Sequence, residues 1–168
     1  MSGGKNGAVV CDTSTLIFLA KLDCLHLIPA LLGEDILILQ CVADEVLSPS
    51  CNASEKLRLQ DFFKTITIVD DDHCAYESQT LSRSDCLTLT YAVASKAAWL
   101  LVDERLLRRI AMEEGLRVVG FLGLLIQAAD KGLMTKASVM GRIESAISDH
   151  GMHISINLYR KLVDLLSK

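Results

Sequence analysis

This 168-residue chain has few aromatic residues and few prolines, and that scarcity limits the structural classes to which it can belong. Aromatic residues make up 5% of it and there are two prolines, whereas 51% of the residues are hydrophobic. This composition argues against a disordered segment, a disulfide-rich scaffold and an all-β barrel. At this length a chain can bury a proper core as one domain. We therefore expect a helix-rich domain packed with Leu, Ile, Val and Ala.

Long apolar runs and paired cysteines are also missing. No apolar run approaches the roughly 18–20 residues that span a bilayer, and Asp12 interrupts the first apolar stretch before it could form a signal-peptide core. We therefore expect a cytoplasmic protein without a membrane partner. The absence of any Cys-x-x-Cys pair favours buried, reduced thiols over zinc ligands or disulfides. The six cysteines are Cys11, Cys24, Cys41, Cys51, Cys74 and Cys86.

The chain lacks an excess of basic residues and several well-known motifs. Its net charge is −4, whereas a basic domain is the usual electrostatic signature of nucleic-acid binding. Contact with nucleic acid would therefore depend on local basic residues or on bound metal ions. GxGxxG, Walker A and GxSxG motifs are absent, which argues against dinucleotide-binding, P-loop and α/β-hydrolase sites.

What the sequence does contain is an alternation of short apolar strands with helices. Strands are expected at 8–11, 36–39, 65–69, 99–102 and 117–119, and helices at 16–22, 25–32, 41–47, 54–63, from 82 onward, 104–114, 122–131, 135–148 and 155–167. This alternation implies βαβ units and a parallel sheet covered on both faces. The predicted fold class is α/β, a three-layer α/β/α sandwich with a central parallel sheet and a helical C-terminal tail. We expect a flexible start over 1–7 and a single domain over 8–168.

Four acidic residues occupy related places in this pattern. Asp12 and Asp103 directly follow predicted strands, and Glu45 and Asp85 lie in the first turn or so of a helix. In a parallel sheet these places face the carboxyl edge, where open α/β sheets bind their ligands. Four carboxylates gathered there would repel one another unless hard cations lay between them. Mg²⁺ or Mn²⁺ held by oxygen ligands is an arrangement that hydrolyses phosphodiesters.

The same four positions are also compatible with a structural interpretation. Asp12 and Asp103 could be helix N-caps, Ser82 and Asp85 could form a capping box, and Glu45 could be a solvated acid. A strand-end aspartate could also be a phosphatase nucleophile, but the usual partner acid two residues later is missing because position 14 is Ser. The spacing by itself leaves the metal-site and capping interpretations open.

The order of the acidic segments resembles the PIN-domain family, the metal-dependent ribonuclease fold of VapC-type toxins. The stretch VCDTSTLI at 10–17 looks like the opening motif of that family, and VADEV at 42–46 resembles its second motif. The segment LSRSDCLTL at 81–89 falls where the family carries a Gly-(Glu/Asp) pair, and LLVDER at 100–105 is similar to its fourth motif. The run GLRVVGFLGLL at 115–125 is similar to an uncharacterised VapC-like branch.

This resemblance implies roles for particular residues. Catalysis and the binding of one or two Mg²⁺ or Mn²⁺ ions would fall to Asp12, Glu45, Asp85 and Asp103. Substrate contacts would come from Thr13 or Ser14, which would orient Asp12 or touch the scissile phosphate, and from Arg105, Arg108 and Arg109, which would meet RNA backbone phosphates. The three arginines are equally compatible with a solvated, salt-bridged helix face.

The function that this implies is a Mg²⁺- or Mn²⁺-dependent endoribonuclease, with the toxin of a toxin–antitoxin pair as one setting. Its expected partners are an RNA substrate, an antitoxin protein and a second copy in a homodimer. The alternative is a catalytically weak or inactive PIN-like module that binds RNA or a protein partner. This alternative is motivated by Ser84 in place of the usual Gly, Asp85 in place of the longer Glu, and Leu107 in place of a frequent Gly. A phosphatase-like hydrolase of small phosphate esters is a third option.

Overall fold

The computed structural model describes residues 7–168. It contains two compact units, the first ending at Phe121 and the second spanning Leu122–Lys168. Except for Gly7, the flexible start expected over 1–7 lies outside the described residues. A single domain over 8–168 stays a prediction.

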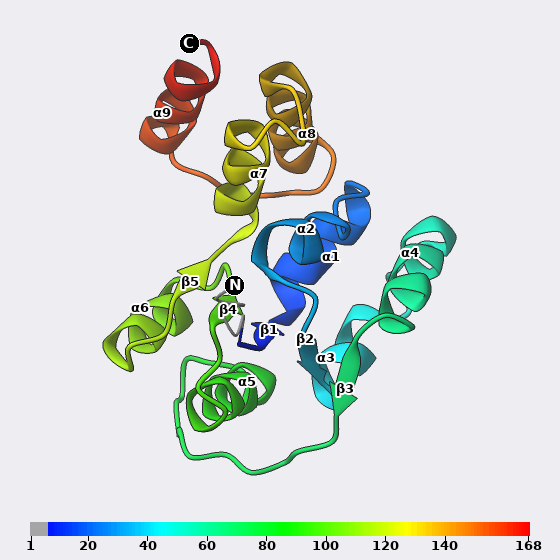
Figure 1. Cartoon of the computed structure of the whole chain (residues 1–168), viewed down its shortest axis with the longest axis vertical. Coiled ribbons are helices and arrows are strands. Elements are labelled where there is room, and N and C mark those ends of the chain that lie inside the picture. Colours follow the sequence, from blue (N-terminus) through cyan, green and yellow to red (C-terminus); the bar gives the residue numbers. More distant parts are fainter. Residues whose placement is uncertain (1–6) are drawn as a thin grey trace, which may run out of the picture. The chain divides into compact units, whose positions relative to one another are not determined.

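The first unit is built around a five-stranded parallel sheet (Figure 1). Its strands lie in the order β3-β2-β1-β4-β5, with Val10 of β1 in register with Leu37 of β2 and Leu100 of β4. All three residues of the central strand β1 are buried, as expected for a strand covered on both faces. The strands are β1 (Val9–Cys11), β2 (Ile36–Leu39), β3 (Thr67–Val69), β4 (Trp99–Leu101) and β5 (Val118–Val119).

Two groups of helices cover this sheet. Helix α1 packs against α3 and α4, whereas α5 packs against α6 and against β1 and β2. This arrangement confirms the predicted three-layer α/β/α sandwich with a parallel sheet. The helices of the first unit are α1 (Thr13–Lys21), α2 (Leu27–Leu32), α3 (Gln40–Val46), α4 (Ala53–Phe63), α5 (Arg83–Ala94) and α6 (Arg105–Glu113).

The second unit contains the predicted C-terminal helices. They are α7 (Phe121–Asp130), α8 (Lys136–Ser148) and α9 (Ile156–Leu166). The first residue of α7, Phe121, belongs to the first unit. The hydroxyls of Thr135 and Ser155 cap α8 and α9 by accepting from the backbone N–H three residues later. Gly132 and Gly151, at φ of 71° and 69°, follow the ends of α7 and α8, where a residue with a Cβ would be strained.

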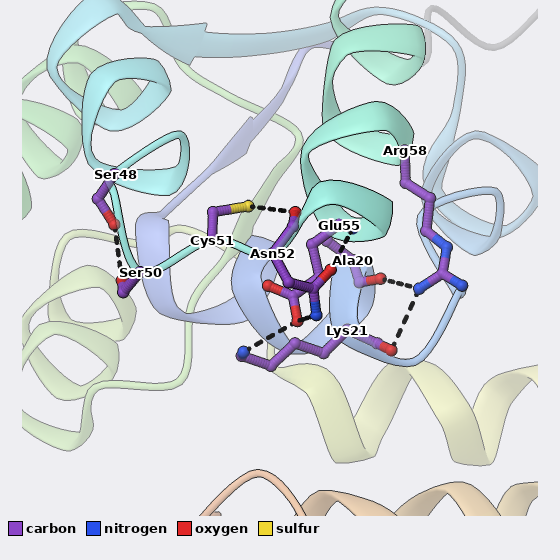
Figure 2. A network of polar contacts seen from close by, with 8 residues as sticks. All are labelled: Ala20, Lys21, Ser48, Ser50, Cys51, Asn52, Glu55 and Arg58. Carbon is purple, nitrogen blue, oxygen red and sulfur yellow. Dashed lines mark hydrogen bonds and ion pairs between the residues drawn. The ribbon is translucent and has the colours of Figure 1, made fainter.

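A polar network centred on the buried Glu55 ties the end of α1 to the beginning of α4. Figure 2 shows the Glu55 carboxylate accepting from Asn52 at 2.7 Å and from Lys21 Nζ at 3.1 Å. Arg58 donates to the Ala20 carbonyl at 2.9 Å, close to the last turn of α1. Glu55 is therefore a buried acid with a structural role, and it fixes the helix that follows Asp12.

Several element boundaries differ from the sequence-based expectation by one to three residues, and two of these differences have a clear physical reason. The third strand begins at Thr67 rather than at 65, because the N–H and hydroxyl of Thr65 both donate to the Phe62 carbonyl and extend the end of α4. Helix α1 begins at Thr13 rather than at 16, because Asp12 caps it. As expected, the cysteines are free thiols, with Cys11, Cys24 and Cys86 buried and the other three half-buried. No helix within 7–168 is long and apolar enough to cross a membrane.

Two buried threonines of α5 provide a matched test of its packing. The Thr90 hydroxyl donates to the Cys86 carbonyl at 2.7 Å and accepts from Ala75 N at 3.0 Å, whereas the Thr88 hydroxyl has no hydrogen-bond partner within the described part of the chain. We expect Thr90→Val to lower the free energy of unfolding by about 1–3 kcal/mol, because it leaves the Ala75 N–H without its acceptor. Thr88→Val should leave that free energy unchanged or raise it. Urea unfolding of both variants measures the difference, and equal losses would contradict this account.

Candidate functional site

Asp12 connects the central strand to the first helix. Its backbone N–H donates to the Leu101 carbonyl at 3.0 Å and so prolongs the β1–β4 ladder. One carboxylate oxygen accepts from Thr15 N at 3.0 Å and the other from the Ser14 hydroxyl at 3.1 Å. Asp12 is therefore the N-cap of α1, as the capping interpretation predicted, and it also lies at the carboxyl end of a central strand. Only 1% of its surface is exposed.

Asp103 follows the neighbouring strand β4 and contacts the same helix. The Thr15 hydroxyl donates to Asp103 Oδ2 at 2.8 Å, and the backbone N–H of Phe121 donates to Oδ1 at 3.0 Å. The prediction that Asp103 could be an N-cap is wrong: Glu104 caps α6 by accepting from Leu107 N. The Asp103 carboxylate accepts hydrogen bonds from Thr15 and Phe121, and Glu104 provides the N-cap of α6 in its place.

Thr15 joins the two acids. Its backbone N–H binds Asp12 and its hydroxyl binds Asp103, and its side chain is completely buried. Strands β1 and β4 are neighbours at the point where the strand order reverses. From β1 the chain adds β2 and β3 on one side, and then adds β4 and β5 on the other side. Open parallel sheets bind ligands in the crevice beyond the strand ends at such a switch point. Asp12 and Asp103 both occupy that position.

Gly120 allows the chain to approach Asp103 closely. A Cβ at position 120 would overlap Asp103 Oδ1, and it would lie 2.9 Å from Arg108 Nη1 and 3.1 Å from the Val102 carbonyl. A residue with a side chain at this position would therefore displace the carboxylate or the arginine. The absence of a Cβ lets the following N–H, that of Phe121, reach Asp103.

Burial dominates the electrostatics of the two acids. It raises the pKa of Asp12 to about 7, with the nearby Asp103 charge adding to the effect and the hydrogen bonds from Thr15 and Ser14 opposing it. Burial also raises the pKa of Asp103, against the lowering effects of Thr15, the Phe121 N–H and Arg108. Near neutral pH the Asp12 carboxyl is therefore divided between its protonated and ionised forms, and a cation would favour the ionised one.

Glu45 reaches the same region through Thr13. The Thr13 hydroxyl donates to Glu45 Oε2 at 2.6 Å, and Thr13 directly follows Asp12. The expected place of Glu45 in the first turn or so of its helix is corrected: it is in the last turn of α3, because that helix begins at Gln40 immediately after β2. The Glu45 side chain is exposed.

Asp85 forms the predicted capping box. Its Oδ2 accepts from Ser82 N at 3.3 Å while the Ser82 hydroxyl accepts from Asp85 N at 3.1 Å. Within residues 7–168 the contacts of Asp85 do not include any of the other three acids, and no cluster of three or more His, Cys, Asp or Glu side chains there is arranged to hold a metal ion. The structure therefore brings Asp12 and Asp103 together, places Glu45 next to them through Thr13, and leaves Asp85 in its own cap.

The predicted substrate-contacting residues have different surroundings. Arg108 donates to the Val102 carbonyl at 2.8 Å and lowers the pKa of Asp103, which makes it a support of the acid. Arg105 and Arg109 are exposed and available for a ligand. Thr13 and Ser14 each donate to an acid, Glu45 and Asp12 respectively.

Sequence reasoning missed Thr15, Gly120 and the Phe121 N–H. Thr15 had a local signal, because a residue three positions after an N-cap Asp donates its backbone N–H to the cap. Gly120, immediately after a predicted strand, marked a close approach of the backbone. The partnership of Phe121 with Asp103 joins residues 18 positions apart and has no local signal.

Comparisons with known proteins agree with this fold. A family model described as a PIN domain matches residues 8–168. The chain belongs to the PIN-domain family. Among solved structures it is similar to a PilT N-terminus domain protein from the hyperthermophilic archaeon Sulfolobus solfataricus P2, with a TM-score of 0.51 and 12% identity over 88% of this chain and 99% of that chain. No curated protein matches it. As a PIN domain, the chain has the fold of a family of nucleases.

The raised pKa of Asp12 predicts how stability depends on pH in the presence of a chelator. The pKa is about 7 in the folded chain against an ordinary value of 3.8, so the folded state holds this proton more tightly than the unfolded state. The contribution of Asp12 to the free energy of unfolding is therefore fully present below pH 4 and is lost as the pH rises to about 7. Urea unfolding at several pH values should show this loss in the wild type and lack it in Asp12→Asn. Asp44→Asn, a change at an exposed acid, should follow the wild type, and parallel curves for all three proteins would contradict the assignment.

Proposed function

We propose that this PIN domain is a Mg²⁺- or Mn²⁺-dependent endoribonuclease that cleaves single-stranded RNA. The observation that carries the proposal is the pair of carboxylates, Asp12 and Asp103, joined by Thr15 at the switch point of the sheet. Asp12 is buried and Asp103 is half-buried at this ligand-binding edge, and desolvation raises the pKa of both acids. Such a pair is typical of a functional site.

The donor set suits a hard divalent cation. Mg²⁺ prefers oxygen ligands and is commonly bound by one or two carboxylates together with several waters. Asp12 and Asp103 offer two carboxylates. Glu45 accepts a hydrogen bond from Thr13, the residue that directly follows Asp12. Glu45 and Asp85 already accept hydrogen bonds, from the Thr13 hydroxyl and the Ser82 N–H, so a cation would compete with these bonds for a third or fourth ligand. Asp12 and Asp103 are therefore the proposed principal ligands, with Glu45 and Asp85 completing the site.

A bound cation supplies an activated water and charge stabilisation for hydrolysis of the phosphodiester. The protein residues orient that chemistry. Thr15 holds the two carboxylates in a fixed relation, Ser14 orients Asp12, and Arg108 together with the Phe121 N–H holds Asp103. The exposed Arg105 and Arg109, in α6 directly after Asp103, are suited to contact the phosphates of the RNA backbone.

The proposed biological setting is a toxin–antitoxin pair. In that setting the chain forms a homodimer, and an antitoxin protein covers the acidic edge with a basic side chain placed among the carboxylates. This part rests on the likeness to VapC-type toxins. The net charge of −4 fits a basic inhibitor better than it fits unassisted binding of RNA.

Calorimetric titration with Mn²⁺ tests the proposed ligands. At pH 7.5 the wild type should bind Mn²⁺ with micromolar-to-millimolar affinity, and Asp12→Asn and Asp103→Asn should each abolish the binding heat because each removes a carboxylate from a two-acid site. Asp44→Asn is the matched control, since Asp44 is an exposed acid in the same helix as Glu45 and is hydrogen-bonded to Gln40. Loss of binding in this control, or retention in both site variants, would contradict the assignment.

Cleavage of a fluorescent single-stranded RNA tests the activity and the role of Asp85. Asp12→Asn should lose more activity than the roughly 10–100-fold that removal of a supporting residue costs. If Asp85 binds the cation, Asp85→Asn should also lose most activity, whereas Ser82→Ala, which breaks the same capping box but keeps the carboxylate, should retain it.

The second candidate function is a PIN module that binds RNA or a protein partner without turnover. The observation that favours it is the engagement of Asp85 in its capping box. RNA binding that is indifferent to Mg²⁺, with no cleavage of any single-stranded substrate, would support this module and contradict the nuclease proposal.

A further inference from the structure

The segment between β3 and α5, residues 70–82, contains neither helix nor strand and is attached to α5. Ala75 N donates to the Thr90 hydroxyl at 3.0 Å. The Ser78 hydroxyl accepts from Leu81 N at 3.0 Å, and Leu81 is buried in the cluster that contains Cys86 and Leu89 of α5. Hydrogen bonds and apolar contacts therefore hold this segment in a defined position against the helix.

This attachment brings two thiols together. Cys74 packs against the buried cluster that contains Cys86, and both cysteines line one cavity. The Cys74 thiol donates to the Tyr76 carbonyl at 3.1 Å and is half-buried. The proposed metal site uses neither thiol.

The cavity between the segment and α5 gives a reagent access to this pair. Its volume is about 650 Å³, and besides the two cysteines it is lined by polar residues that include His73, Ser78 and Arg83. A peptide-sized thiol compound fits into a space of this volume. Cys86 itself is only 4% exposed, so an oxidant reaches Cys74 first.

We propose that Cys74 and Cys86 are a redox-active pair that forms a reversible disulfide on reaction with a small-molecule disulfide such as oxidised glutathione. The Cys74 sulfur attacks one sulfur of the oxidant, which forms a mixed disulfide and releases one glutathione thiol carrying the Cys74 proton. The Cys86 sulfur then attacks the Cys74 sulfur and displaces the second glutathione, which leaves with the Cys86 proton. Two protein thiols are oxidised and one glutathione disulfide is reduced to two thiols.

The disulfide would tie the segment 70–82 to the first turn of α5. Cys86 directly follows Asp85, the acid that the structure leaves in its capping box. A covalent link at this point restrains the helix terminus that carries Asp85, the acid whose recruitment to the proposed metal site would require it to leave its cap. The formation of the disulfide depends on the two thiols alone and is tested without any measurement of nuclease activity.

The chain itself offers a clean experiment. Trypsin cleavage at Lys64, Arg83 and Lys96 separates Cys74, in the peptide 65–83, from Cys86, in the peptide 84–96. The full-length reduced protein is incubated with oxidised glutathione, alkylated, digested without reduction and analysed by mass spectrometry. We expect a link between the 65–83 and 84–96 peptides at least about tenfold more often than a link between Cys41 and Cys51 inside the single tryptic peptide 22–56. The reason is that Cys74 and Cys86 line one cavity, and a disulfide forms only between thiols whose Cβ atoms are close.

Cys41 and Cys51 are an internal reference. Both are half-buried, as Cys74 is, and their separation of ten residues (51 − 41) is close to the twelve (86 − 74) of the proposed pair. In urea, where only chain separation matters, the two links should form at similar rates. Cys74→Ser should remove the cross-link and leave Cys86 unmodified, whereas the matched variant Cys51→Ser should keep it.

The variant Cys86→Ser tests whether Cys74 reacts first. Without the Cys86 thiol to displace the second glutathione, Cys74 should accumulate as the mixed disulfide with glutathione. If this buried substitution prevents folding, Cys74→Ser and the comparison in urea still decide the question. Glutathione on Cys74 without a cross-link to Cys86 in the folded wild type would overturn the proposal. So would cross-links distributed equally between the two pairs.

Discussion

The structure of the first unit depends on keeping two acids, the buried Asp12 and the half-buried Asp103, close together at one edge of the sheet. Burial of carboxylates in a poorly polarisable environment is costly unless hydrogen bonds or opposite charges compensate. Here the compensation comes from Thr15 to both acids, from Ser14 to Asp12, and from the Phe121 N–H to Asp103. The start of α1, the glycine at 120 and the supporting arginine at 108 all follow from this requirement.

Helix α1 is fixed at both ends for that reason. At its beginning it provides the N–H and hydroxyl of Thr15 to the acids, so a rotation of the helix would break both contacts at once. At its end, Lys21 binds the buried Glu55 and Arg58 donates to the carbonyl of Ala20. A buried carboxylate that is broken away from its partner is strongly destabilising, which makes this second contact an effective anchor. The buried Glu55 therefore stabilises α1, the helix whose Thr15 holds Asp12 and Asp103 in place.

Local signals in the sequence predicted the existence of every strand and some of the helix caps, whereas they did not predict the tertiary contacts. The run at 36–39 predicts β2 correctly because charged or polar residues border four apolar ones, and the capping box of Ser82 and Asp85 follows from a spacing of three. The partnership of Thr15 with Asp103 joins residues 88 positions apart, and a long-range contact of this kind leaves no periodic pattern. The same reason explains the mistaken cap at Asp103, whose carboxylate has distant partners.

The capping and metal-site interpretations can be compared by the hydrogen bonds that each acid would lose on binding a cation. Asp12 caps α1 and still lies beside Asp103 at the switch point, so a cation there would satisfy a charge that burial now disfavours. Asp85 is different, because its carboxylate already receives the Ser82 N–H and its own N–H binds the Ser82 hydroxyl. Recruiting Asp85 to a cation would release the Ser82 N–H and so break one of the two hydrogen bonds of the capping box. The acids therefore form a graded set, in which Asp12 and Asp103 gain most from a cation and Asp85 gains least.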